Sequence, residues 1–96
     1  MHAAAVKVEL LIPGSQSLKA KRKVLISTIR KMRDAYPVAV AEVDHQDTWQ
    51  RATLAIGVVA GERFMLDESI QAVLRMLDRR TDLEVVSSET SYLEVA

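Results

Sequence analysis

The sequence predicts an α+β fold with the element order βαββαβ. Four segments alternate apolar and polar residues with the period of two that is typical of β-strands, and two longer segments repeat apolar residues at helical spacing. No internal repeat or linker separates them. At 96 residues the chain can build one modest hydrophobic core. We therefore expect a single domain over residues 1–96.

The first half of the chain predicts a strand, a helix and a second strand. Ala3–Ile12 alternates regularly and is stopped by Pro13-Gly14. Ser15 or Ser17 can cap a helix whose apolar positions repeat at helical spacing, and this helix ends before Pro37. Val38–Asp44 is a short strand.

The second half of the chain predicts another strand, a second helix and a last strand. Ala52–Ala60 alternates again, Arg63–Arg80 has one apolar face, and Leu83–Val95 is the last strand, with Ser87-Ser88 marking a bulge or bend. With right-handed crossovers this order gives a ferredoxin-like fold, in which a four-stranded antiparallel sheet carries two helices on one face.

Composition narrows the class of protein. Apolar residues make up 49% and charged residues 27%, which is ordinary for a globular protein. No apolar run approaches the roughly 20 residues of a membrane span, and no secretory signal is visible. The chain has no cysteine, so disulfides and thiol chemistry are excluded. We expect a cytoplasmic protein with no membrane association and no cofactor.

Charge is sorted along the chain although the net charge is zero. Residues 1–33 carry eight cations and one acid, and the remainder carries five cations and twelve acids. Four cations, Lys19, Lys21, Arg22 and Lys23, occupy the first helix where the helix dipole favours anions. They either form a phosphate site with the free N–H groups of the helix start, or pair with Glu42, Asp44 or Asp47, or are solvated.

The loop Glu42–Arg51 is the strongest functional candidate, because it gathers polar, ionisable and aromatic groups between two apolar runs. His45 beside Asp44 suggests a general base or a metal ligand, but one loop histidine supplies too few ligands, so we expect neither a catalytic nor a metal residue. Trp49 is either an exposed platform for a base or partner, or a cap over the core. Arg51 either grips a phosphate or carboxylate, or pairs with a loop aspartate.

The expected topology brings three segments to one end of the molecule: Pro13–Lys23, Asp44–Arg51 and Arg79–Asp82. It also leaves one sheet face without a helix. On the central strands that face carries Ala5, Lys7, Glu9, Leu11, Thr53, Ala55, Gly57 and Val59, with no aromatic on which an RNA base could stack. A flat face of small residues favours a homodimer, through this face or through the edge strands.

Two segments resemble a known family. Ser17-Leu18-Lys19-Ala20-Lys21-Arg22-Lys23-Val24-Leu25 is similar to its "SLKxKRxVL" signature, and residues 41–52 to its "AEVDHQDxWQRA" signature. Both are typical of the YlxP-like family of small bacterial proteins. The resemblance implies a ferredoxin-like fold and a bacterial cytoplasmic protein of uncharacterised role. Family members are often encoded beside transcription-elongation, translation-initiation and ribosome-maturation factors, which suggests a link to ribosomes or RNA.

These observations favour a non-enzymatic binding protein whose partner is RNA or a ribosome-associated protein. The expected binding residues are Lys19, Lys21, Arg22, Lys23, Asp44, His45, Asp47, Trp49, Gln50 and Arg51. One alternative is a protein or enzyme that binds a small phosphorylated or carboxylated metabolite at the same end. Another is a structural protein-interaction module whose polar loop only stabilises the hairpin.

Overall fold

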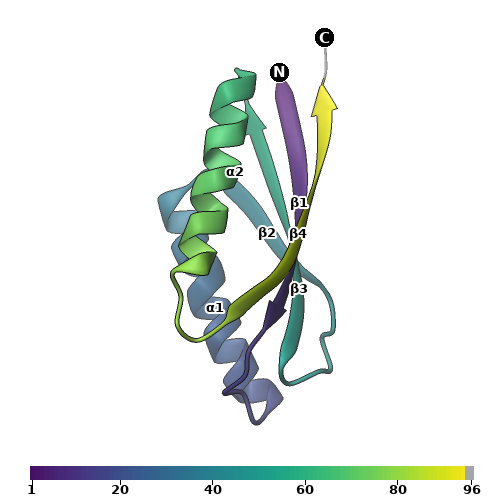
Figure 1. Cartoon of the computed structure of the whole chain (residues 1–96), viewed down its shortest axis with the longest axis vertical. Coiled ribbons are helices and arrows are strands. Elements are labelled where there is room, and N and C mark those ends of the chain that lie inside the picture. Colours follow the sequence, from purple (N-terminus) through teal and green to yellow (C-terminus); the bar gives the residue numbers. More distant parts are fainter. Residues whose placement is uncertain (95–96) are drawn as a thin grey trace.

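The computed structural model describes residues 1–94 and confirms the ferredoxin-like α+β fold. The elements are β1 (His2–Leu11), α1 (Leu18–Ala35), β2 (Val38–Asp44), β3 (Arg51–Ala60), α2 (Arg63–Asp78) and β4 (Glu84–Glu94). The strand order is β2-β3-β1-β4 and all neighbouring strands are antiparallel. Both helices cover one face of this sheet (Figure 1). The predicted last residue of the final strand, Val95, lies outside the described residues.

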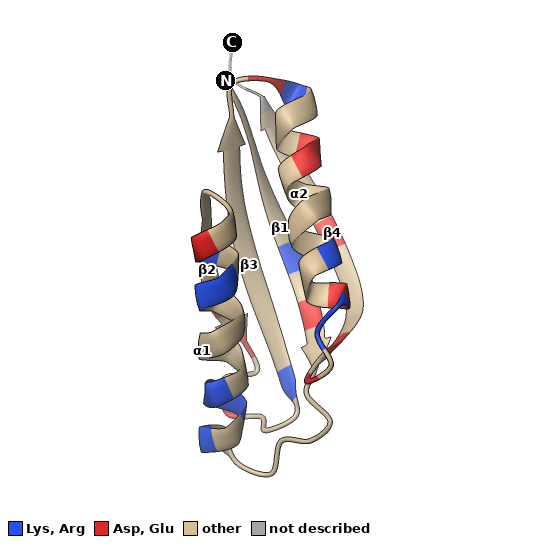
Figure 2. Ribbon diagram, turned by 90° about the vertical axis from the view of Figure 1, so that its left-hand side faces the viewer, with Lys and Arg blue, Asp and Glu red and all other residues tan. Residues whose placement is uncertain are grey.

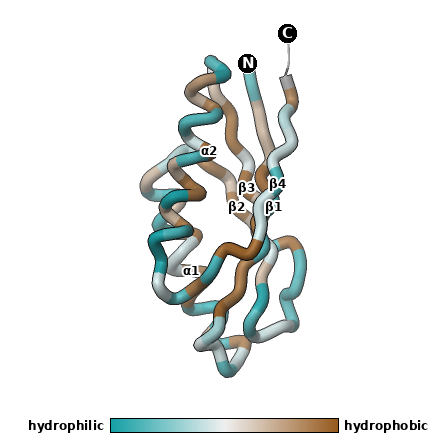
Figure 3. The backbone as a smooth tube through the Cα atoms, in the orientation of Figure 1, coloured by the Kyte–Doolittle hydropathy of each residue, from teal (hydrophilic) through white to brown (hydrophobic). Residues whose placement is uncertain are grey.

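The core lies between the sheet and the two helices. Alternate residues of β1 and β3 point toward the helices, so that their apolar positions share one face. Figure 3 shows hydrophobic and hydrophilic residues alternating along the elements. The core side chains include Val6, Val8, Leu10, Leu54, Ile56, Leu25, Met32, Leu66 and Ile70. Neither helix of the described chain has the length and apolar character to cross a membrane.

Two irregularities in strand pairing set which side chains face the helices. Glu9 pairs with Ser87 but Leu10 pairs with Val85, so that Val86 is extra, one residue before the predicted Ser87-Ser88 bulge. A second shift lies between Glu42 and Asp44. Glu42 pairs with the inward-facing Leu54, whereas Asp44 pairs with Thr53 on the other face. A bulge of this kind re-aims the side chains beside it.

The helices are offset along a molecule of 46 × 21 × 18 Å. The start of α1 and the β2–β3 loop both lie at the lower end in Figure 1, as predicted. The segment after α2 does not join them. Arg80 Nη2 lies 3.5 Å from the hydroxyl oxygen of Ser27, which is near the middle of α1. Arg79–Asp82 therefore packs beside the middle of α1, and two of the three predicted segments meet.

Candidate functional site

The entry into α1 is held by its own serines. Ser17 has an extended backbone, with φ of −164°, and its hydroxyl oxygen accepts a hydrogen bond from the Ala20 N–H at 3.0 Å. This is the N-cap arrangement, so Ser17 is the cap and not Ser15. Ser15 is buried and donates its hydroxyl to the Ser17 carbonyl at 3.1 Å. Both hydroxyls at the start of the helix thus have partners within the chain.

Lys21 is buried rather than presented at the surface. Only 1% of the residue is exposed, because it lies on the same face of α1 as Leu25 and Thr28. Its ammonium group donates to the carbonyl oxygen of His45 and lies 2.8 Å from Glu42 Oε2. The contact with Glu42 is an ion pair without good hydrogen-bond alignment. Among the four cations at the start of α1, Lys21 is therefore the one that pairs with an acid of the described chain, and its buried ammonium is not available to phosphate.

The turn after β2 is built on the backbone of His45. This residue has φ of 62°, in the left-handed region that few residues other than glycine adopt. Its carbonyl also accepts the Thr48 N–H at 3.0 Å, and its own N–H donates to Asp44 Oδ1 at 2.8 Å. Lys21, Asp44 and Thr48 together hold the main chain of His45 in this conformation.

The imidazole of His45 lies on the open face of the sheet, beside an acid that sequence reasoning did not include among the site residues. His45 Nε2 is 3.9 Å from Glu9 Oε2, and this same oxygen accepts the Thr53 hydroxyl at 2.8 Å. The Thr53 hydroxyl is inaccessible to a substrate because the residue is fully buried. The contact between Glu9 and Thr53 follows from the pairing of β1 with β3, in which these two residues are direct partners on the same face of the sheet.

Gln50 fastens the loop to the entry of α1. Its side-chain amide donates to the Ser15 carbonyl at 3.1 Å and to the Pro13 carbonyl at 3.4 Å. Its own carbonyl accepts the Ile12 N–H at 2.8 Å. The β1–α1 connection and the β2–β3 loop thus form one hydrogen-bonded end of the molecule.

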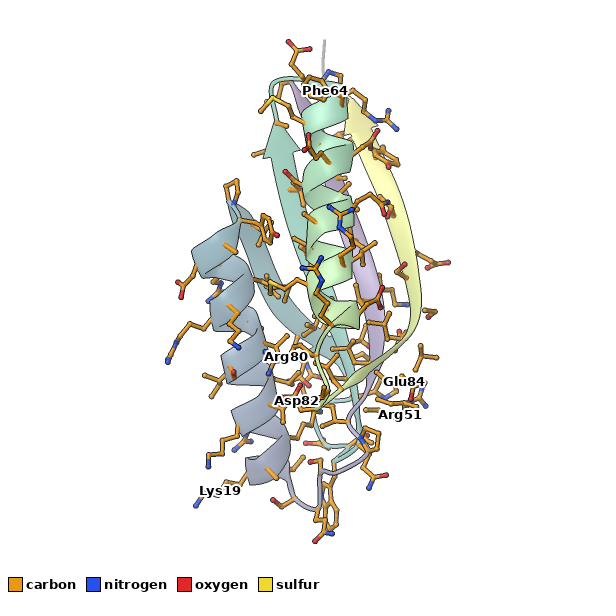
Figure 4. The ribbon with its side chains drawn as sticks, turned by 60° about the vertical axis from the view of Figure 1, so that its left-hand side comes forward. Lys19, Arg51, Phe64, Arg80, Asp82 and Glu84 are labelled. Carbon is orange, nitrogen blue, oxygen red and sulfur yellow. The ribbon has the colours of Figure 1, made fainter. Side chains whose placement is uncertain are left out.

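The remaining predicted site residues are free at the surface. Lys19, Arg22, Lys23, Asp47, Trp49 and Arg51 are all exposed, and none makes a side-chain hydrogen bond or ion pair with another residue of the described chain. Figure 4 shows Lys19 projecting outward from the start of α1. Trp49 is 53% exposed, so it does not cap the core. Arg51 does not pair with a loop aspartate. Within residues 1–94 no group of three His, Asp or Glu side chains is placed to hold a metal ion.

Comparison with known proteins finds matches over most of the chain. The family model described as "Protein of unknown function (DUF503)" matches residues 3–90. The curated protein "Uncharacterized protein YlxP" of Bacillus subtilis (strain 168) is 31% identical over 84 residues, which cover 88% of this chain and 91% of that protein. The chain therefore belongs to the DUF503 family, whose function is unknown.

Proposed function

We propose that this protein binds the phosphate backbone of RNA, free or in the ribosome, through one face of α1. The observation that carries the proposal is a row of exposed cations, which we call the basic stripe: Lys19, Arg22, Lys23, Arg30 and Arg33. At 100° per residue they fall within an arc of about 100° on the helix. Figure 2 shows Lys and Arg gathered along α1, with acids more frequent over α2 and β4.

The length and charge of the stripe suit a nucleic-acid backbone. Lys19 and Arg33 are fourteen positions apart in the sequence, which is about 21 Å along the helix axis and long enough for several consecutive phosphates. Four of the five cations have no partner in the described chain; the fifth, Arg33, donates to the Val40 carbonyl at 2.8 Å. No acid of α1 lies on the same arc, and Asp34 lies about 20° outside it. Positive charge is thus neither paired nor balanced along the stripe.

The contact of Arg33 with Val40 favours a nucleic acid over an added peptide strand. β2 is an edge strand, and a peptide that extended the sheet would need its outward carbonyl groups. Arg33 already occupies the Val40 carbonyl, in the manner by which natural proteins protect sheet edges. The family resemblance, with its ribosomal gene context, supports the same choice, and a cytoplasmic location follows from it as part of the proposal. The small-anion alternative receives less support, because the Ser15 and Ser17 hydroxyls are already engaged.

The test is binding to ribosomal RNA and to ribosomal subunits, measured by fluorescence anisotropy at low and moderate salt. If four phosphates are neutralised, log K falls with log salt at a slope of about −3. Arg22→Ala/Arg30→Ala should weaken binding by about tenfold or more and make the slope shallower. The matched control is Arg75→Ala/Arg79→Ala, which removes the same charge from exposed positions on and beside α2. Equal weakening by the two variants, or no binding at low salt, would reject the proposal.

We also propose that the sheet face without helices pairs with a second copy of the chain. Its apolar half consists of Ala3, Ala5, Ala39, Ala41, Ala55, Gly57, Val59 and Leu93. Val59 and Leu93 are 65% and 63% exposed. A Cβ on Gly57 would meet the Ala39 Cβ at 3.8 Å, an ordinary contact, so packing within one chain does not require a glycine here. The missing side chain of Gly57 would instead allow the sheet of a second copy to approach closely.

The size of this face is sufficient for a modest dimer. Four strands spaced about 4.8 Å apart and about 30 Å long present on the order of 600 Å² per chain, which reaches the lower limit of stable interfaces when doubled. Sedimentation at about 10 µM should report a dimer. Ala41→Arg should then give a monomer, whereas Gln71→Arg on the exposed surface of α2 should not. A wild-type monomer at that concentration contradicts the dimer.

A further inference from the structure

We infer that Trp49 is a stacking platform for one unpaired base of a single-stranded RNA whose phosphates lie along the basic stripe. This inference rests on the proposed function and adds the kind of RNA. Trp49 is the only tryptophan of the chain and is 53% exposed, and its ring makes no hydrogen bond within residues 1–94. Indole rings pair a large apolar surface with a single polar N–H, so a half-exposed one offers a face to a ligand.

The loop holds Trp49 at the same end of the molecule as the start of the basic stripe (Figure 1). On one side of Trp49, the His45 carbonyl binds the ammonium of Lys21, the residue before Arg22. On the other side, the Gln50 amide binds the Ser15 carbonyl, four residues before Lys19. The chain between these two ties is too short to carry Trp49 far from α1. A base on the indole and phosphates on the stripe can therefore belong to one RNA strand.

The residues that flank Trp49 are held before any ligand arrives. The Thr48 N–H donates to the His45 carbonyl at 3.0 Å, and the Gln50 carbonyl accepts the Ile12 N–H at 2.8 Å. Both chain neighbours of Trp49 are thus fixed by backbone hydrogen bonds, while its ring has no such tie. Because the backbone on both sides of Trp49 is ordered in advance, little backbone entropy is lost when the ring binds a base.

Charge separates the path of the phosphates from the site of the base. Asp47 is exposed and has no ion pair within the described part of the chain, so it repels a phosphate that approaches Trp49 from the loop side. The four free cations of the stripe attract phosphates on the side of α1. Bases of a duplex are stacked inside it and cannot reach the indole, whereas an unpaired base can. Among the strand residues that the structure describes, no aromatic side chain lies on the open sheet face to compete for it.

The experiment follows the fluorescence of Trp49, excited selectively, during titration with three ligands. These are a uridine oligomer of about 12 nucleotides, an RNA duplex of the same length and inorganic polyphosphate, which has the charge without bases. We expect the oligomer to quench the fluorescence, while the duplex and polyphosphate bind to the stripe and leave it nearly unchanged. Equal quenching by polyphosphate would assign the signal to phosphate contact and overturn the inference.

Two variants complete the test. Trp49→Ala should weaken binding of the oligomer by about tenfold and leave polyphosphate binding unchanged, and Trp49→Phe should retain most of the affinity. Arg22→Ala/Arg30→Ala should weaken the binding of both the uridine oligomer and polyphosphate. If Trp49→Ala leaves the affinity for the oligomer unchanged while the stripe variant lowers it, the stacking site is rejected and the proposed function stands. If neither the uridine oligomer nor polyphosphate binds wild-type protein at low salt, the stacking site and the proposed function are both rejected.

Discussion

The Lys21 ammonium nitrogen lies 2.8 Å from Glu42 Oε2, and it also donates to the carbonyl oxygen of His45. Lys21 is on the inner face of α1, and both of its partners belong to the end of β2 and the turn after it. A buried ammonium is unfavourable unless it is paired and hydrogen-bonded, so this cation fixes where the loop can lie. Its exposed neighbours in sequence remain free to meet a ligand.

Removing the ammonium of Lys21 should destabilise the fold. In Lys21→Met the methylenes are kept, but Glu42 and the His45 carbonyl lose their partner, and we expect a loss of about 2–4 kcal/mol in the free energy of unfolding. Denaturant unfolding measures it. The control Lys19→Met, at an exposed position that has no side-chain partner in the described chain, should stay within about 0.5 kcal/mol of wild type. Similar stability of the two variants would contradict the role assigned to Lys21. Lys21→Met/Glu42→Gln should recover part of the loss.

Gln50 should hold the loop against the entry of α1. Gln50→Ala removes the amide that donates to the Ser15 and Pro13 carbonyls, and we expect a loss of about 1 kcal/mol. Hydrogen exchange should become faster at Thr48, whose N–H closes the turn, and remain unchanged at the centre of β3. Unchanged exchange at Thr48 would mean that the turn is held without Gln50.

The elements of this fold could be read from the sequence because their signals are local. Alternation of side chains along β1 and β3, and helical spacing along α1 and α2, depend only on neighbours a few residues apart. The position of Lys21 was also encoded, because it lies four residues before Leu25 on the apolar side of the helix. Grouping it with Lys19, Arg22 and Lys23 by charge concealed that position. Helical phase is the better guide to which cations are exposed.

The details of the site could not be predicted because they depend on pairing between distant segments. The bulge between Glu42 and Asp44 places Asp44 opposite Thr53 on the open face of the sheet, and nothing in the sequence of β2 marks it. The contact between His45 and Glu9 joins residues 36 positions apart. Trp49 was open to two interpretations from sequence alone, since an indole is common both over cores and on binding surfaces.

His45 should tolerate glycine better than a β-branched residue. Its φ of 62° suits glycine, and valine is strongly disfavoured there because its branched Cβ crowds the backbone. We expect His45→Gly to remain within about 1 kcal/mol of wild type and His45→Val to lose about 1–2 kcal/mol more. Thermal unfolding of the pair measures the difference. Equal stability of the two variants would show that the turn relaxes out of the left-handed conformation.

Asp82 should make stability depend on pH below its ordinary pKa of 3.8. Arg80 holds this carboxylate with two hydrogen bonds, Nε to Oδ1 at 2.9 Å and Nη2 to Oδ2 at 2.6 Å. The side-chain hydrogen bonds from Arg80, with its charge, lower the pKa of Asp82 in the folded protein. A lowered pKa stabilises the fold above the unfolded-state pKa, and this stabilisation is lost as pH falls through the folded-state pKa.

The difference in unfolding free energy between wild type and Asp82→Asn should therefore have its full value at neutral pH and become smaller as pH falls below 3.8. Denaturant unfolding at a series of pH values measures this difference. In an Arg80→Ala background the lowering of the pKa is removed, so Asp82→Asn should have a smaller effect at neutral pH, and less of the effect should be lost on acidification. An undiminished difference between wild type and Asp82→Asn well below pH 3.8 would exclude the pairing with Arg80 as its cause.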